Sequence, residues 1–133
     1  MKFEKWLLHE FSTGTCIGED FKRFLRDMKS DLKQMAENND LELSKFNKNH
    51  YCFSAVLKDK KSDQYVYVSM SDVRGRHDWS QKVLIRNMRY ENDWTGETNF
   101  FCCWEDVGSK AGKLIQQKIN VKQRLEIKND RSR

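Results

Sequence analysis

Residues 71–81, with the sequence SDVRGRHDWSQ, bring together the side chains best suited to acid–base chemistry. Arg74, Arg76, His77 and Asp78 place two guanidinium groups, an imidazole and a carboxylate within five positions. Histidine titrates close to neutral pH, so this residue type is able to donate and accept protons. A single histidine among charged loop residues is nevertheless more often solvated than catalytic. We therefore expect no catalytic role for this cluster.

The chain lacks the short motifs that mark common catalytic loops. It has no Gly-rich phosphate loop, no Gly-x-Ser-x-Gly elbow and no Walker-type Gly-Lys-Ser/Thr. Gly14 and Gly18 precede a predicted helix, whose first amides can hold an anion. Two glycines that let the chain turn between helices are the simpler explanation. We expect a binding protein that is not an enzyme.

His50 and Cys52 are candidate metal ligands, because residues two apart on a strand point to the same face. Zinc needs two further ligands from elsewhere in the chain. The candidates for these are Cys16, His77, Cys102 and Cys103. No Cys-x-x-Cys pair is present, and reduced cysteines often serve as small buried hydrophobic residues. We expect no cofactor, with zinc as the open alternative.

Trp79 and Trp94 both fall in predicted loops, each beside charged residues. Tryptophan and arginine are the residue types most enriched where binding energy concentrates in protein interfaces. The candidate partner-binding residues are therefore Arg74, Arg76, His77, Trp79 and Trp94. The alternative is that both tryptophans fold inward over the core, since large aromatic side chains usually bury most of their area.

Positive charge is concentrated at the C-terminal end of the chain. Residues 110–133 hold eight Lys or Arg against two acids, whereas residues 1–109 hold seventeen bases and eighteen acids. The net charge of +5 thus belongs to the C-terminal part, which has enough cations to contact phosphates. The candidates for nucleic-acid contact are Lys118, Lys122, Arg124 and Lys128. No aromatic residue lies among them for base stacking, and a solvated helix end is the alternative interpretation.

One amphipathic helix must organise the fold that carries these residues. Large apolar side chains recur at relative positions 0, 3, 4, 7, 11 and 14, namely at Phe21, Phe24, Leu25, Met28, Leu32 and Met35. Such a helix needs an apolar surface to cover. We expect it to run from residue 17 or 18 to Glu37, after a short helix over residues 3–11. The sequence Asn38-Asn39-Asp40 should end it, with asparagine in the left-handed conformation.

The pattern then changes to a period of two, which predicts strands near residues 41–46, 51–57, 64–70, 82–90 and 99–104. Val66, Val68 and Met70 are the better core set of the third strand. A last helix begins near Val107 and loosens beyond Asn120. The prediction is an α+β fold, in which an antiparallel sheet of four to five strands packs against N-terminal helices and a C-terminal helix. Residues 1–120 would form one domain and residues 121–133 a flexible basic tail.

No apolar run reaches the length of a membrane span, and the N-terminus lacks the apolar core of a signal peptide. These two absences lead us to expect a cytoplasmic protein with no membrane partner. They leave the oligomeric state open.

Three stretches, LHEFSTGT-x-IGEDFKRFLRDMKSDLK, LELSKFNKNHY and DWTGETN, resemble small proteins of Gram-positive phages, prophages and conjugative elements, some of which are type II-A anti-CRISPR proteins. The resemblance extends over about residues 2–115. Type II-A inhibitors bind the RNA-guided DNA nuclease and block its guide, its target DNA or its domain movement. The resemblance implies a stoichiometric inhibitor in the bacterial cytoplasm, with a CRISPR-associated nuclease as partner, alone or with its guide RNA.

Two further implications concern charge and metal. Many type II-A inhibitors are acidic and imitate DNA, whereas this chain has a near-neutral body and a basic end. The resemblance therefore points to a protein lobe or the guide RNA as the bound surface. At least one such inhibitor contains zinc, which keeps the zinc alternative open. The alternative function is a nucleic-acid-binding accessory protein of a mobile element that uses the basic tail.

Overall fold

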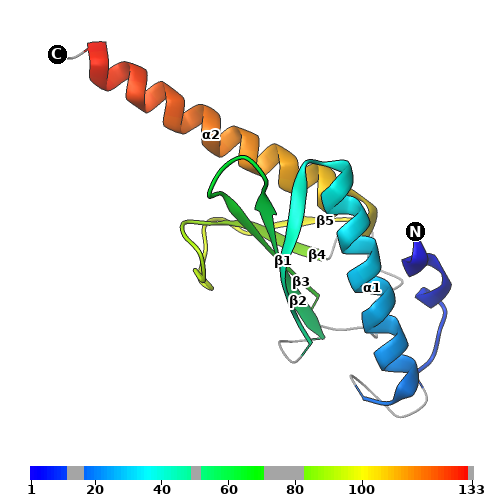
Figure 1. The fold of residues 1–133 in the computed structure, drawn as a ribbon. Helices are drawn as coiled ribbons and strands as arrows, with labels where there is room; N and C mark the ends of the chain where they lie inside the picture. The colour runs from blue at the N-terminus through cyan, green and yellow to red at the C-terminus, as the bar shows by residue number, and fades with distance from the viewer. Residues whose placement is uncertain (12–16, 49–51, 71–82, 132–133) are drawn as a thin grey trace.

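Five antiparallel strands form one sheet in the order β1-β2-β3-β4-β5, and helices cover one of its faces (Figure 1). The computed structural model describes residues 1–11, 17–48, 52–70 and 83–131, and the structural statements below concern these ranges. The elements are η1 (Lys2–Trp6), α1 (Glu19–Asn38), β1 (Leu41–Asn47), β2 (Phe53–Asp59), β3 (Tyr65–Met70), β4 (Val83–Met88), β5 (Phe100–Cys102), η3 (Trp104–Asp106) and α2 (Val107–Arg131). The predicted α+β architecture is confirmed.

The apolar stripe of α1 faces the sheet. All six residues predicted for it are buried: Phe21, Phe24, Leu25, Met28, Leu32 and Met35. The helix begins directly after Gly18, whose φ of 97° is a conformation that favours glycine. At its other end Asp40, with a φ of 56°, adopts the left-handed conformation in which we expected asparagine. Aspartate also tolerates it, because its short side chain can form local hydrogen bonds.

The two faces of the sheet belong to different hydrophobic clusters. Val66, Val68 and Met70 of β3 join the main core beneath the helices, as predicted. The opposite face carries a smaller cluster, to which no described helix residue belongs. Its members are Val56, Tyr65, Tyr67 and Met88, with Leu84 packed against them. The sheet therefore has a second face on which loops and strand side chains, rather than helices, make the surface.

The N-terminal segment differs from the expected helix over residues 3–11. It forms the short 3₁₀-helix η1, which packs along α1 (Figure 1). The buried carboxylate of Asp31 accepts hydrogen bonds from the backbone N–H groups of Lys2 and Phe3, both at 2.9 Å. These two donors are used by a side chain of α1, so this tertiary contact decides the conformation of the segment.

The C-terminal helix α2 is longer than expected and continues to Arg131 rather than loosening at Asn120. Its first turns are buried through Val107, Ala111, Leu114 and Ile115. Residues 121–128 are exposed, and the C-terminal end of α2 lies far from the other elements (Figure 1). The boundary placed at residue 120 stays a prediction. Neither α1 nor α2 is apolar enough along its length to cross a membrane.

Candidate recognition surface

The loop between β4 and β5, residues 89–99, is built around the buried carboxylate of Asp93. Arg89 donates to its Oδ2 from the backbone N–H at 3.0 Å and from Nε at 2.8 Å, and Arg89 Nη2 donates to Oδ1 at 3.1 Å. The Thr95 hydroxyl at 3.0 Å and the Gly96 N–H at 3.1 Å also donate to Oδ1. Charge-assisted bonds of this kind are the stronger ones, so the loop has a defined conformation.

The charge of this carboxylate is stabilised by the same contacts. Hydrogen bonds from the side chain and backbone of Arg89 hold the pKa of Asp93 far below its usual range. The Asp93 carboxylate in turn raises the pKa of Arg89. Both groups therefore stay ionised at neutral pH, and the loop remains tied to the end of β4.

Trp94 follows Asp93 in this loop and reaches back over the second face of the sheet. Its indole meets the ring of Tyr67 edge-on, with centroids 6.0 Å apart and an interplanar angle of 82°. The Arg86 guanidinium lies 4.5 Å from the centre of the same Tyr67 ring and donates to the Trp94 carbonyl oxygen. Lys45 Nζ lies 5.7 Å from the Trp94 ring centroid and donates to Asn92. Cationic and aromatic groups from three strands and one loop thus meet here.

We define the Trp94 surface as Lys45, Arg86, Trp94 and Phe101. Trp94 is 43% exposed and Phe101 is 59% exposed. Phe101 lies on the same face as Arg86, because it pairs with Leu84, two residues before Arg86 on β4. An aromatic and arginine-containing surface on a rigid support matches the composition of protein-binding hot spots.

Of the predicted partner-binding residues, only Trp94 lies within the described part of the chain. Arg74, Arg76, His77 and Trp79 lie outside the described residues. Trp94 lies on the second face of the sheet, where it covers part of Tyr67 and leaves the rest of its indole exposed. Trp94 is therefore only partly packed against the sheet, and its role in partner binding stays a prediction.

Sequence reasoning missed Lys45 and Arg86 as parts of this surface. A signal for Arg86 was available, because it alternates on β4 with the apolar residues Val83 and Ile85 and thus must face away from the helices. No such signal existed for Lys45. It reaches Trp94 only because β1 and the loop after β4 meet in three dimensions.

The predicted nucleic-acid residues divide into two groups. Lys118 is committed to the fold, since its Nζ donates to the Met88 carbonyl oxygen at 3.0 Å and pairs with Glu97 at 2.9 Å. Lys122, Arg124 and Lys128 are exposed on the projecting half of α2. The structure therefore leaves three of the four residues available to a polyanion.

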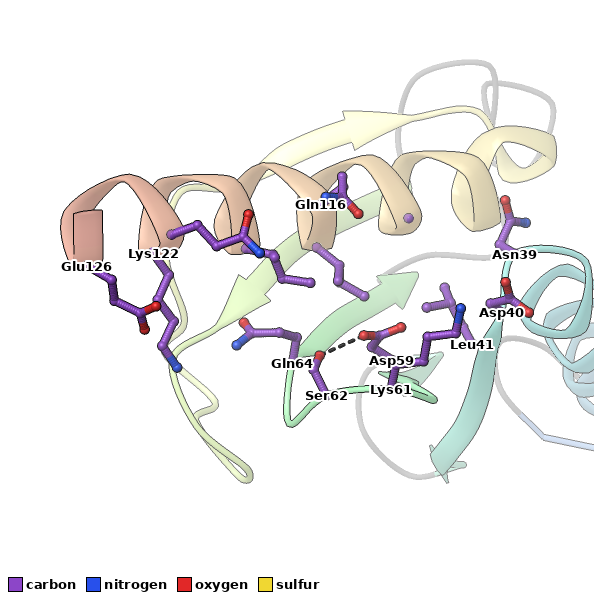
Figure 2. A pocket seen from close by; sticks show the side chains of 14 residues that line it. Asn39, Asp40, Leu41, Asp59, Lys61, Ser62, Gln64, Gln116, Lys122 and Glu126 are labelled. Carbon is purple, nitrogen blue, oxygen red and sulfur yellow. Dashed lines mark hydrogen bonds between the residues drawn. The ribbon is translucent and has the colours of Figure 1, made fainter. Parts of the chain in front are cut away.

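A groove of about 550 Å³ lies between α2, the turn that joins β2 to β3 and the junction of α1 with β1 (Figure 2). Lys61 and Lys122 line it together with Asp40, Asp59 and Glu126. Asp59 is engaged by the Ser62 hydroxyl, which donates to it at 2.6 Å. Because acidic and basic residues line this groove together, it favours neither anions nor cations.

Cys102 and Cys103 have raised pKa values, so little of either thiol is in the nucleophilic thiolate form. Burial raises the pKa of Cys102 to about 11, and the nearby Asp106 carboxylate adds to the effect. Burial likewise raises the pKa of Cys103. Cys52 is buried, while its proposed co-ligand His50 and the candidate ligands Cys16 and His77 lie outside the described residues. Within the described ranges no three His, Cys, Asp or Glu side chains come together as a metal site.

Comparisons with known proteins give no assignment. The chain matches no protein-family model, no curated protein and no solved structure.

Proposed function

We propose that this protein inhibits a type II CRISPR RNA-guided nuclease by binding it in a stoichiometric complex, without catalysis. The observation that supports binding is the Trp94 surface, where a half-exposed indole and an arginine are held rigidly on an open sheet face. The class of partner comes from the resemblance of the sequence to type II-A anti-CRISPR proteins.

Rigidity favours this surface as a binding site. Arg86 and Lys45 are already bonded to the Trp94 loop, so a partner does not have to order them. Pre-organised side chains lose less conformational entropy on association. A partner that covers the exposed part of Trp94 and Phe101 would gain hydrophobic burial at the centre of the contact.

The test is a DNA-cleavage assay with the host nuclease and its guide RNA, titrated with this protein. Inhibition should be complete near a molar ratio of about one when the nuclease concentration exceeds the Kd, with co-elution in gel filtration. Trp94→Ala should weaken the complex roughly 30-fold or more, the equivalent of about 2 kcal/mol for a hot-spot residue. Leu8→Ala, which truncates an exposed apolar side chain near the N-terminus, is the matched control and should inhibit normally.

One result would reject nuclease inhibition, and another would reject the Trp94 surface as the contact. One is full cutting at large molar excess with no complex in gel filtration. The other is a complex of unchanged affinity after Trp94→Ala, in a variant that remains folded by circular dichroism, which would remove the Trp94 surface as the contact.

The second candidate is a nucleic-acid-binding accessory protein of a mobile element. The exposure of Lys122, Arg124 and Lys128 on the projecting half of α2 favours it. It predicts DNA or RNA binding that weakens steeply with salt and disappears when the chain is truncated after Asn120. Binding that survives the truncation would exclude the tail as its cause.

A further inference from the structure

The aspartates and the bases of α1 lie on different sides of the helix, although residues 1–109 as a whole are nearly neutral. Three aspartates, Asp20, Asp27 and Asp31, occur at i, i+7 and i+11 and therefore share one side of the helix. All three are turned toward the rest of the fold, and Asp20 and Asp31 are buried. Their negative charges consequently contribute little to the outer surface of the helix.

Each of these aspartates is also engaged by a specific donor. Asp20 lies 3.0 Å from His9 Nε2. Asp27 accepts from Trp6 Nε1 and pairs with Lys5 Nζ, both at 2.8 Å. Partial burial opposes ionisation of Asp27, but hydrogen bonds from Lys5 and Trp6 outweigh it and lower its pKa. Each of these three carboxylates is thus engaged by a group outside α1.

The bases of α1 form a continuous stripe on the other side. We define the α1 basic face as Lys22, Arg23, Arg26, Lys29 and Lys33. The spacing i, i+4, i+7 and i+11, typical of one helix face, is that of Lys22, Arg26, Lys29 and Lys33. Lys29 is half-buried and the others are exposed. Over eleven residues the stripe is about 16 Å long.

Few acidic side chains form ion pairs with the bases of this stripe. Lys22 pairs with Glu19 at 3.1 Å, and both side chains are exposed. Glu37, at the far end of the helix, pairs instead with Lys60 at 3.1 Å. Within the described part of the chain, Arg23, Arg26, Lys29 and Lys33 make no ion pair, and all but the half-buried Lys29 are exposed.

One end of the stripe opens into a hollow of about 460 Å³ between η1 and α1. Arg23, Arg26 and Lys5 line it together with Asp27, the carboxylate that pairs with Lys5. Arg23 and Arg26, which form no ion pair among the described residues, are the cations in this hollow that remain for a phosphate group.

We propose that the α1 basic face binds the phosphate backbone of duplex DNA, with Arg23, Arg26, Lys29 and Lys33 as the contacts. The proposal is independent of nuclease inhibition and assigns nucleic-acid binding to the folded domain rather than to the end of α2. Its basis is charge complementarity: Arg26, Lys29 and Lys33 share one helix face, Arg23 lies beside it, and none of the four forms an ion pair within the described residues.

The shape of the face favours duplex DNA over other nucleic acids. An α-helix with its side chains is about 10–12 Å wide, which fits the roughly 12 Å major groove of B-form DNA. The corresponding groove of duplex RNA is too narrow for side chains to read. Single strands are usually held by stacking on exposed aromatic rings, and the α1 basic face contains none.

The experiment measures fluorescence anisotropy of a labelled 20-base-pair DNA duplex of arbitrary sequence between 50 and 200 mM salt. The α1 triple variant is Arg23→Gln, Arg26→Gln and Lys33→Gln. The matched control is Lys122→Gln, Arg124→Gln and Lys128→Gln, which also lowers the net charge from +5 to +2. Circular dichroism melts verify that both variants are folded.

We expect the wild type to bind with a steep salt dependence. The α1 triple variant should lose roughly 10-fold or more in affinity at 50 mM salt, and its log–log salt slope should be shallower by about 2.7, or 0.9 for each lost contact. The α2 control variant should retain most of the wild-type affinity and slope.

Three outcomes would overturn the proposal. The first is no binding by the wild type at 50 mM salt. The second is loss of binding in the α2 control but not in the α1 triple variant, which would assign the phosphate contacts to the end of α2. The third is equal or tighter binding of a single strand or of an RNA duplex of the same sequence, which would exclude the fit to the DNA groove.

Discussion

The indole of Trp104 donates a hydrogen bond of 3.1 Å to the buried carboxylate of Asp31, a residue 73 positions earlier in the chain. The same carboxylate accepts the N–H groups of Lys2 and Phe3, so one side chain of α1 joins the N-terminus, the long helix and the connection into α2. Trp104 was expected at the end of a strand, but it lies in η3, where its indole is 1% exposed.

Asp31→Ala should therefore destabilise the protein by at least about 2 kcal/mol. The substitution removes two buried hydrogen bonds, from Phe3 N–H and Trp104 Nε1, and one part-buried bond from Lys2 N–H, and the loss of a buried partner costs roughly 1–3 kcal/mol. Urea unfolding followed by circular dichroism measures the change. Ser30→Ala, at the adjacent and half-buried position, is the control and should stay within about 0.5 kcal/mol of the wild type. Equal stability of the two variants would contradict the role given to Asp31.

The two glycines of α2 should respond to alanine in opposite directions. A Cβ at Gly108 would lie 2.7 Å from Asn39 Nδ2 and 3.0 Å from both Met35 Cβ and the Met35 carbonyl oxygen, where α1 and α2 approach each other. We expect Gly108→Ala to destabilise by about 1–3 kcal/mol, because the two helices would have to separate.

At Gly112 the nearest atom to such a Cβ is Asn39 Oδ1 at 3.9 Å, an ordinary contact. Gly112→Ala should stabilise the protein by up to about 1 kcal/mol through helix propensity alone. Thermal and urea unfolding of both variants check the pair. Destabilisation by Gly112→Ala would show that this part of α2 packs more closely than described.

Acid should weaken the Asp93 loop. The folded-state pKa of Asp93 is depressed by Arg89, so its contribution to stability is fully present above the unfolded pKa of about 3.9 and is lost as pH falls below that value. Asp93→Asn should thus be less stable than the wild type at pH 7, and the difference should shrink between about pH 4 and pH 2. Unfolding measured at a series of pH values provides the comparison. A difference that does not change with pH would argue against ionic stabilisation of the loop.

Cys102 should alkylate slowly in the folded protein. Its pKa of about 11, against 9.0 for an ordinary thiol, lowers the thiolate fraction at pH 8 roughly 100-fold. Iodoacetamide labelling followed by peptide mass spectrometry compares the native protein with the protein in denaturant. Equal labelling rates at Cys102 in the two states would contradict the burial of this thiol.

Much of the fold could be predicted from the sequence because its signals are local. The apolar spacing of α1 and the alternation of Val66, Val68 and Met70 each depend on the geometry of a single element. The end of α2 was misplaced, because the apolar pattern loosens beyond Asn120 whereas the helix continues to Arg131 with its side chains exposed. The conformation of η1 was missed because Asp31, which binds its amides, is 28 residues from Phe3.

The candidate sites divide in the same way. The spacing of residues was enough to predict that α1 is amphipathic, that its bases recur with the period of a helix and that Trp94 belongs to a loop. The tertiary contacts alone show that Asp20, Asp27 and Asp31 are engaged by groups outside α1, and that Arg23, Arg26, Lys29 and Lys33 form no ion pair among the described residues. They likewise show that Lys45 and Arg86 hold Trp94 on the second face of the sheet. The physical reason is that periodicity gives the direction of a side chain from its own backbone, whereas its charge balance and exposure depend on partners distant in sequence.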